Sequence, residues 1–176
     1  MMLFLRNRLT FVKKRDIMKK LDLEEVRSFI DAQSPETKIY IGCDSYRFKD
    51  NTGAWYARYT TVVVVHINGK NGCRVFGTID TERDYDAKKN RPYLRMMNEV
   101  QRSVKMYQEL EEAIGDREIS LHIDINPNEM HGSNVAYNSA MGYVKGMIGI
   151  EPIAKPNAHA SSFAADHFRS YRLEDA

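Results

Sequence analysis

The segment Lys38–Ser45 is a short apolar run with β-branched residues, a pattern typical of a mostly buried strand. Alternation places Ile41 on one face of this strand and Asp44 on the other. Gly42 shares the face of Asp44 and lacks a side chain, which leaves space for another part of the molecule. We therefore predict that the carboxylate of Asp44 emerges beside a close contact.

A second strand is predicted for Ile119–Asn126, in which the odd positions are aliphatic and the even positions are polar. This period of two is the pattern of a strand with one buried face. Asp124 lies on the polar face, together with His122 and Asn126. The chain thus places a second carboxylate on a predicted strand.

Two further acids fall on predicted helices. A long helix is expected from about Pro92 to Ile114, because its apolar residues follow helical spacing, and Glu99 borders this apolar stripe. Asp166 lies in Ser161–Phe168, a segment of small residues that a serine can cap as a short late helix. Four separate elements therefore contribute one carboxylate each: Asp44, Glu99, Asp124 and Asp166.

The remaining pattern predicts a mixed sheet. Asn68–Gly72 is a strong turn sequence between two strand-like runs, so the first three strands form an antiparallel meander. A strand, helix, strand crossover then sets the strand of Asp124 parallel to the first strand. The other expected elements are a helix after Asp22, strands at Tyr56–Ile67 and Cys73–Ile79, a helix capped by Ser133 and ended by Gly149, and a short edge strand at Glu151–Pro156.

The order of the four acids resembles that of the ribonuclease H-like superfamily, with acids on the first strand, the first long helix, the fourth strand and a late helix. The motifs IGCDS, VVVVH, HIDINPN, SNVAYNSAMGYVKGM and KPNAHASSFAAD further resemble a small bacterial group of ribonuclease H-like proteins, the YkuK type. The resemblance covers roughly Leu21 to His167. It departs from that group at His159, where an aromatic residue is expected, and in the basic first segment.

The resemblance implies an α/β fold with a ribonuclease H-like mixed five-stranded sheet, in which an antiparallel meander and parallel strands are flanked by helices. It also implies two-metal hydrolysis of phosphodiester bonds, with 5′-phosphate and 3′-hydroxyl product ends. In that scheme Asp44 bridges both metal ions and Asp166 binds on one side. Glu99 and Asp124 bind on the other side, and all four acids are the expected catalytic residues.

A cluster of carboxylates also requires positive charge on elementary grounds. Two carboxylates about 4 Å apart repel by roughly 4 kcal/mol at an effective dielectric near 20, so three or four of them need protons or cations. Mg²⁺ prefers oxygen ligands and keeps several waters, which suits a cluster that also receives phosphate oxygens. Two such ions activate the attacking water and stabilise the leaving oxygen. We therefore expect two Mg²⁺ or Mn²⁺ ions.

Composition bounds the class of protein. With 176 residues, 43% of them hydrophobic and 28% charged, the chain suits one domain at 21–176 after a basic N-terminal segment at 1–20. No apolar stretch reaches the roughly 20 residues of a spanning helix, and the first residues make a poor signal peptide. A cytoplasmic protein without membrane contact is therefore expected.

The two cysteines, Cys43 and Cys73, lie on separate predicted strands and lack the spacing of a zinc site. Both are interpreted as small buried hydrophobes. A nucleophilic Cys43 paired with His122 is disfavoured, because the adjacent Asp44 would raise the pKa of the thiol.

Positive charge gathers in two places, although the net charge is only +2. Residues 1–20 hold seven Lys or Arg against one acid, which indicates either a phosphate-binding arm or a solvated tail. A second group leads into the helix of Glu99 and alternates with Tyr85 and Tyr93, so we expect it to hold nucleic acid near the acids. This group consists of Arg83, Lys88, Lys89, Arg91 and Arg95.

Three further side chains are accessory candidates: His122, His167 and Lys145. The histidines offer nitrogen ligands suited to Mn²⁺ or a path for protons, and the lysine offers a phosphate contact. Each also has a plainer interpretation, as a hydrogen-bonded packing group for the histidines and as a solvated side chain for the lysine.

The leading hypothesis is a metal-dependent nuclease, a hydrolase that acts on RNA, an RNA–DNA hybrid or structured DNA. Nucleic acid is the expected partner, with no nucleotide cofactor. A rival is a nucleic-acid-binding module that keeps the acids but lacks turnover, as a subunit of a larger complex. A third interpretation is glycoside hydrolysis by two carboxylates, which needs no metal. Metal-dependent cleavage separates the first two interpretations, and sensitivity to a chelator would exclude the third.

Overall fold

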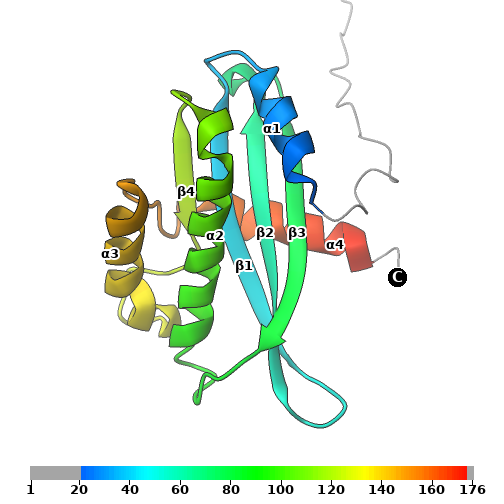
Figure 1. The fold of residues 1–176 in the computed structure, drawn as a ribbon. Helices are drawn as coiled ribbons and strands as arrows, with labels where there is room; N and C mark the ends of the chain where they lie inside the picture. The colour runs from blue at the N-terminus through cyan, green and yellow to red at the C-terminus, as the bar shows by residue number, and fades with distance from the viewer. Residues whose placement is uncertain (1–20, 174–176) are drawn as a thin grey trace, which may run out of the picture.

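The computed structural model describes residues 21–173, with side chains described through residue 170 (Figure 1). The described residues form one mixed sheet of four strands in the order β3-β2-β1-β4. The basic segment predicted at 1–20 lies outside them. The first three strands form an antiparallel meander and β4 pairs with β1 in parallel: β1 Lys38–Lys49, β2 Trp55–His66, β3 Cys73–Arg83 and β4 Ile119–Ile123.

Helices cover both faces of this sheet (Figure 1). One face carries α1 and α2, with α3 packed beside α2, and α4 crosses the other face. The predicted α/β architecture, a mixed sheet flanked by helices, is therefore confirmed. The bounds are α1 Leu23–Asp31, α2 Tyr93–Ile114, α3 Tyr137–Ile148 and α4 Ala165–Leu173, with the 3-10 helices η1 Ile67–Gly69 and η2 Gly132–Ala136 and the π-helix η3 Ala160–Ala164.

The two faces of β1 pack against different layers. Ile41 lies in a core cluster with residues of α1 and α2. Tyr40, on the opposite face, packs against residues of η3 and α4. Gly42 approaches η3 so closely that an added Cβ atom would lie 2.6 Å from the backbone N of Ser161. The close contact predicted beside Asp44 is thus a contact with η3.

The helix limits largely follow the sequence pattern. α2 begins directly after Pro92 and ends at Ile114, as predicted. Asp22 caps α1 by accepting backbone N–H groups of its first turn. The prediction that Ser133 caps the following helix is wrong, because Ser133 lies within η2 and the N-cap residue of α3 is Ala136. The hydroxyl of Ser133 instead accepts the N–H of Asn126 at 3.1 Å.

The described sheet has one strand fewer than the five expected. Ile153 is joined to β4 by a single parallel bridge to His122, with backbone hydrogen bonds of 2.8 and 2.9 Å. The N–H of Lys155 donates to the carbonyl of Ile125 at 3.1 Å, so the missing N–H groups of Pro152 and Pro156 alternate with these donors and face away from β4, as is usual for proline at a sheet edge. The edge strand expected at Glu151–Pro156 is reduced to one bridge.

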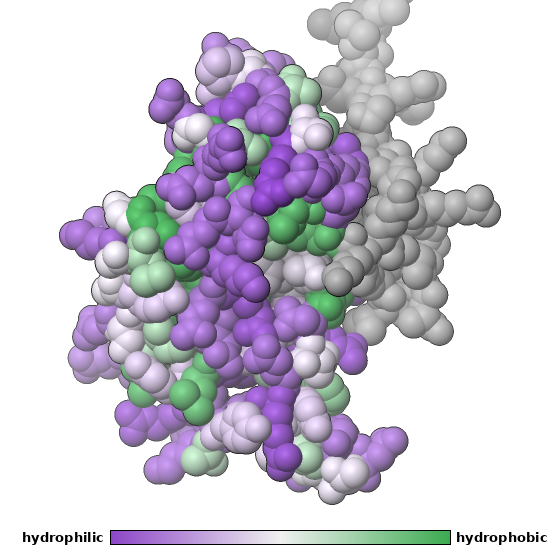
Figure 2. All heavy atoms as spheres, viewed as in Figure 1, coloured by the Kyte–Doolittle hydropathy of each residue, from purple (hydrophilic) through white to green (hydrophobic). Residues whose placement is uncertain are grey.

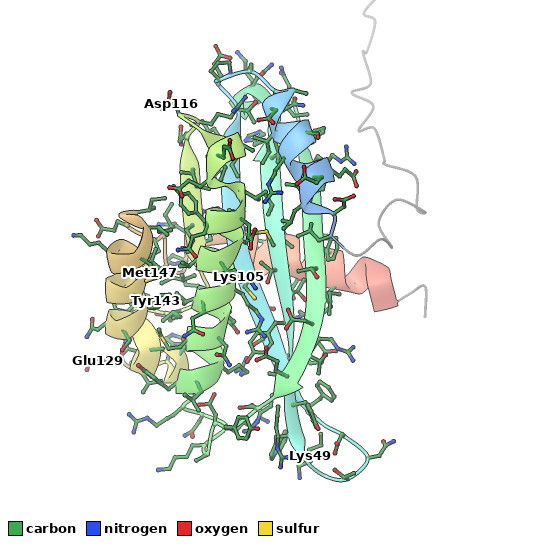
Figure 3. The ribbon with its side chains drawn as sticks, viewed as in Figure 1. Lys49, Lys105, Asp116, Glu129, Tyr143 and Met147 are labelled. Carbon is green, nitrogen blue, oxygen red and sulfur yellow. The ribbon has the colours of Figure 1, made fainter. Side chains whose placement is uncertain are left out.

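The face that bears α1, α2 and α3 is largely hydrophilic, with smaller hydrophobic areas between the helices (Figure 2). Met147, one of the exposed apolar residues, projects from α3 (Figure 3). None of the helices in the described residues is long and apolar enough to cross a membrane.

Candidate functional site

Asp44, within β1, and Asp124, directly after β4, lie side by side. Cys43 of β1 is the parallel register partner of Ile123 of β4, and each aspartate is the next residue along the chain. Neighbouring strands lie about 4.8 Å apart. Alternation directs both carboxylates to the face that η3 and α4 cover. The fold thus brings together the two acids that the sequence placed on strands.

Arg169 of α4 joins two of the acids. Its Nη1 donates to Oδ2 of Asp44 at 3.0 Å, and its Nη2 donates to Oδ1 of Asp166. The side chain of Asp44 is 16% exposed, whereas that of Asp166 is 56% exposed. α4 therefore brings a cation to Asp44 and keeps its own acid close to the surface.

Asp124 has two partners of its own. The ammonium Nζ of Lys155 lies 2.8 Å from Oδ1 and 3.0 Å from Oδ2 of this carboxylate. The hydroxyl of Ser162, in η3, donates to Oδ1 at 3.0 Å. No serine side chain caps η3, so the cap expected in this segment is replaced by a contact with Asp124. Each strand carboxylate therefore has a cationic partner.

Glu99 approaches from the opposite face of the sheet. Its side chain is buried, its Oε1 accepts the hydroxyl of Ser45 at 2.5 Å, and Nη1 of Arg95 lies 3.7 Å from the same oxygen. Oε2 has no hydrogen-bond partner in the described part of the chain. Burial, and next the charge of Asp44, raises the pKa of Glu99 well above its usual range. This setting favours the protonated carboxyl group.

Asp44 interacts electrostatically with each of the other three acids. Burial raises the pKa of Asp44 to about 6, and the charge of Asp124 contributes next, whereas Arg169 opposes the rise. The charge of Asp166 also contributes, and Asp44 and Asp124 both raise the pKa of Glu99. Because such effects fall with distance, they place the other three acids around Asp44, with Glu99 on the opposite face of the sheet.

The accessory candidates have different surroundings. His122 is buried, and its Nδ1 accepts the N–H of Ala160 at 2.9 Å. Burial, with a further effect of His159, lowers the pKa of His122 to about 4. His167 and Lys145 are exposed, and within the described residues neither forms an ion pair with the four acids. His122 therefore fixes η3 against β4, and the functional roles stay predictions.

The basic group that precedes α2 divides into two parts. Arg95 turns inward and donates at 2.9 Å to both the carbonyl and the hydroxyl oxygen of Ser45. It therefore belongs to the surroundings of Glu99. Its contact with nucleic acid stays a prediction, as it does for the others. Four members are exposed at the end of β3 and in the loop that follows: Arg83, Lys88, Lys89 and Arg91.

The cysteines differ from each other. Cys43 is buried, and burial, followed by the charge of Glu99, raises the pKa of its thiol well above the usual range. Cys43 and His122 lie on opposite faces of the sheet by alternation, which disfavours a catalytic pair. Cys73 is exposed, so its interpretation as a buried residue is wrong. It is the first residue of β3, an edge strand beside the turn.

The donor chemistry of the cluster fits a divalent metal such as Mg²⁺ or Mn²⁺. All four acids are oxygen donors, and the buried Oε2 of Glu99 lacks a partner among the described residues. The side chains do not gather around one point, because no group of three or more His, Cys, Asp or Glu in residues 21–170 is arranged to hold an ion. Lys155 and Arg169 supply the positive charge beside Asp124 and Asp44. A metal ion would therefore compete with these two cations.

Comparison with known proteins identifies the family. A family model described as Ribonuclease H-like matches residues 22–170. The chain therefore belongs to the ribonuclease H-like family, as its motifs predicted. No curated protein and no solved structure matches the chain. Membership of the narrower YkuK type stays a prediction.

Sequence reasoning missed the side chains that contact the strand acids. Arg169 follows Asp166 at a spacing of one helical turn, which pairs opposite charges on a helix and is a usable signal. Lys155 lies in a loop between two prolines without a periodic pattern. Its contact with Asp124 depends on that segment running alongside β4, so the sequence carries no local signal for it.

Proposed function

We propose that the protein is a metal-dependent nuclease that hydrolyses phosphodiester bonds in RNA, an RNA–DNA hybrid or structured DNA. The observation that carries this proposal is the juxtaposition of Asp44 and Asp124 on neighbouring strands, with electrostatic effects of Asp166 on Asp44 and of both strand acids on Glu99, in a chain of the ribonuclease H-like family. Acids from four elements repel one another and oppose folding. Such a local cost is typical of a functional site rather than of a structural one.

The four acids share one role in this proposal. Asp44, Glu99, Asp124 and Asp166 would hold Mg²⁺ or Mn²⁺. When bound, the metal activates a water molecule and stabilises charge on the leaving oxygen. The exposed basic residues between β3 and α2 attract the phosphate backbone of the substrate.

A nucleic-acid-binding module without turnover is the second candidate. One observation favours it: Lys155 and Arg169 already neutralise Asp124 and Asp44. A site with built-in cations keeps its shape without a metal. In that case the acids stabilise the fold of η3 and α4 and take no part in hydrolysis.

The test is a cleavage assay with end-labelled single-stranded RNA, RNA–DNA hybrid, single-stranded DNA and a four-way junction, in Mg²⁺, Mn²⁺ or chelator. Asp44→Asn is nearly isosteric and is expected to lower the cleavage rate by about a hundredfold or more. Asp116→Asn is the matched control. Asp116 is exposed in the turn that precedes β4 (Figure 3), whereas Asp124 follows the other end of that strand.

The outcomes separate the candidates. Cleavage that is lost with chelator and with Asp44→Asn, but kept with Asp116→Asn, supports the nuclease. Folded protein that binds nucleic acid and cleaves none of the substrates supports the binding module and overturns the catalytic assignments. Cleavage that continues in chelator contradicts the metal dependence.

A further inference from the structure

The outer part of the β1–β2 hairpin carries aromatic side chains outside the core. Tyr46, Phe48, Trp55 and Tyr56 are only partly buried, and none belongs to a hydrophobic core cluster of the described residues. The hairpin projects beyond α2 and α3 (Figure 1), and Lys49 lies near its end (Figure 3). Large rings in this position add little to the core, which indicates another role.

Three of these rings and one guanidinium group share the face of the sheet that carries Asp44. Tyr46 is the register partner of Arg58, and Phe48 is the partner of Tyr56. The ring centroid of Phe48 lies 6.0 Å from the ring centroid of Tyr46 and 6.0 Å from that of Tyr56. The guanidinium of Arg58 lies 5.7 Å from the ring of Tyr46 and 5.3 Å from that of Phe48. We call these four residues the hairpin stripe.

The hairpin stripe leads to the four acids. Alternation along β1 places Asp44, Tyr46 and Phe48 in a row that spans about 13 Å, at about 3.3 Å per residue. Arg169 connects the first two residues of this row. Its guanidinium lies 5.1 Å from the ring centroid of Tyr46 and donates to Asp44 at 3.0 Å. A ligand chain lying along the hairpin stripe therefore reaches the candidate site.

The charge of this surface is positive. Within the described residues, neither Arg58 nor Arg83, the cross-strand partner of Tyr56, forms an ion pair with a carboxylate. Arg74, near the other end of the sheet, also lies over aromatic rings but pairs with Glu25. A guanidinium group that stacks on rings without a carboxylate partner is suited to a phosphate.

We propose that the hairpin stripe binds a single-stranded segment of nucleic acid. Bases stack on aromatic rings whatever their sequence, and guanidinium groups hold the phosphate backbone. Bases in a duplex already stack on one another, so the rings favour a single strand. The binding stands independently, whereas delivery of that strand to the acids rests on the proposed nuclease function.

Fluorescence anisotropy tests the rings. The probes are end-labelled 12-nucleotide U-rich RNA, T-rich DNA and a duplex of the same length, all in chelator so that no substrate is cleaved. The double substitution Tyr46→Ala with Phe48→Ala is expected to weaken single-strand binding by at least about tenfold. Tyr143→Ala removes a ring from α3 (Figure 3) and is expected to bind as the original chain does.

The salt dependence of binding tests the guanidinium group. Each phosphate contact on a single strand contributes about −0.7 to the slope of log K against log salt concentration. Arg58→Ala is therefore expected to reduce the magnitude of this slope by about 0.7. Arg74→Ala is the matched control, because it removes an arginine that is stacked on rings but paired with a carboxylate. Its slope is expected to stay unchanged.

Each outcome either supports or overturns the proposal. Unchanged single-strand affinity in the double variant, or an unchanged slope in Arg58→Ala, overturns it, as does tighter binding of the duplex. If the double variant does not fold, as judged by circular dichroism, the Arg58→Ala slope decides. If single-strand binding depends on the hairpin stripe but no metal supports cleavage, only the proposed nuclease function is overturned. If the protein cleaves nucleic acid but its single-strand affinity does not change when the hairpin stripe is altered, only this inference is overturned.

Discussion

The two parts of the β1–β2 hairpin are built differently. The inner part pairs Lys38–Cys43 with Thr61–His66, and helices cover both of its faces. The outer part pairs Tyr46–Lys49 with Trp55–Arg58 and carries partly buried aromatic and cationic side chains. Asp44 lies at the boundary between them. One pair of strands thus stabilises the fold at one end and presents chemical groups at the other.

The difference shows how a sheet positions charged groups without unfolding. The inner part is held by apolar contacts on two faces, so it remains folded despite the repulsion between the nearby carboxylates. At the boundary, Asp44 is buried enough for its pKa to rise to about 6, yet it keeps a cationic neighbour in Arg169. The acids therefore lie where rigid packing ends and an accessible surface begins.

The largest expected effect is in the chemical reactivity of thiols. Cys43 ends the inner part and is buried, and its raised thiol pKa leaves less of the reactive thiolate at a given pH. Lys49→Cys introduces an exposed thiol in the outer part. We expect iodoacetamide to label Cys43 at least about a thousandfold more slowly, because labelling requires opening of the structure.

Peptide mass spectrometry measures both thiols in one sample, with exposed Cys73 as an internal reference. Raising the pH from about 7 to about 9 should accelerate labelling of Cys73 and of the introduced thiol as their thiolates form. Equal labelling rates for Cys43 and the introduced thiol would show that the reagent reaches the inner part as readily as the outer part.

The next largest effect is on the free energy of unfolding. Ile41→Ala removes a fully buried side chain from the inner part and is expected to cost about 3 kcal/mol. Phe48→Ala removes a larger but partly exposed side chain from the outer part and is expected to cost less than about 1 kcal/mol. Urea denaturation measures both. A larger loss of unfolding free energy for Phe48→Ala than for Ile41→Ala would contradict the distinction between the two parts.

The smallest of the three effects concerns the contact between Gly42 and η3. Gly42→Ala places a Cβ atom 2.6 Å from a backbone nitrogen, so η3 must shift, at an expected cost of about 2 kcal/mol. Gly146→Ala is the control, because nothing lies within 4 Å of its added Cβ atom. In the middle of a helix it should stabilise by up to about 1 kcal/mol. Thermal unfolding compares the two, and a neutral Gly42→Ala would contradict the tight contact.

Much of the fold could be predicted from local periodicity. The faces of β1 and the limits of α2 follow directly from apolar spacing, because such spacing reports which side of a single element is buried. The predicted strand ends at Ser45, whereas β1 continues to Lys49. The outer residues Tyr46–Lys49 alternate aromatic and basic side chains, a period of two that continues the strand to Lys49.

The start of α2 shows where local signals stop. Pro92 marks the first turn, as expected, but it provides no side-chain cap. Asp86 instead accepts the N–H groups of Leu94 and Arg95 at 2.8 and 2.9 Å. It lies outside the usual capping distance along the chain, so only the course of the loop brings it to the helix.

The sequence by itself determined the ribonuclease H-like family and most of the helices and strands, and it predicted the four acids, because motifs and periodicity are local properties of the chain. The tertiary structure alone decided that Lys155 and Arg169 neutralise the strand acids and that Arg95 turns toward Ser45. These contacts join residues distant in sequence. They form only after η3, α4 and the loops pack on the sheet, so no local pattern encodes them.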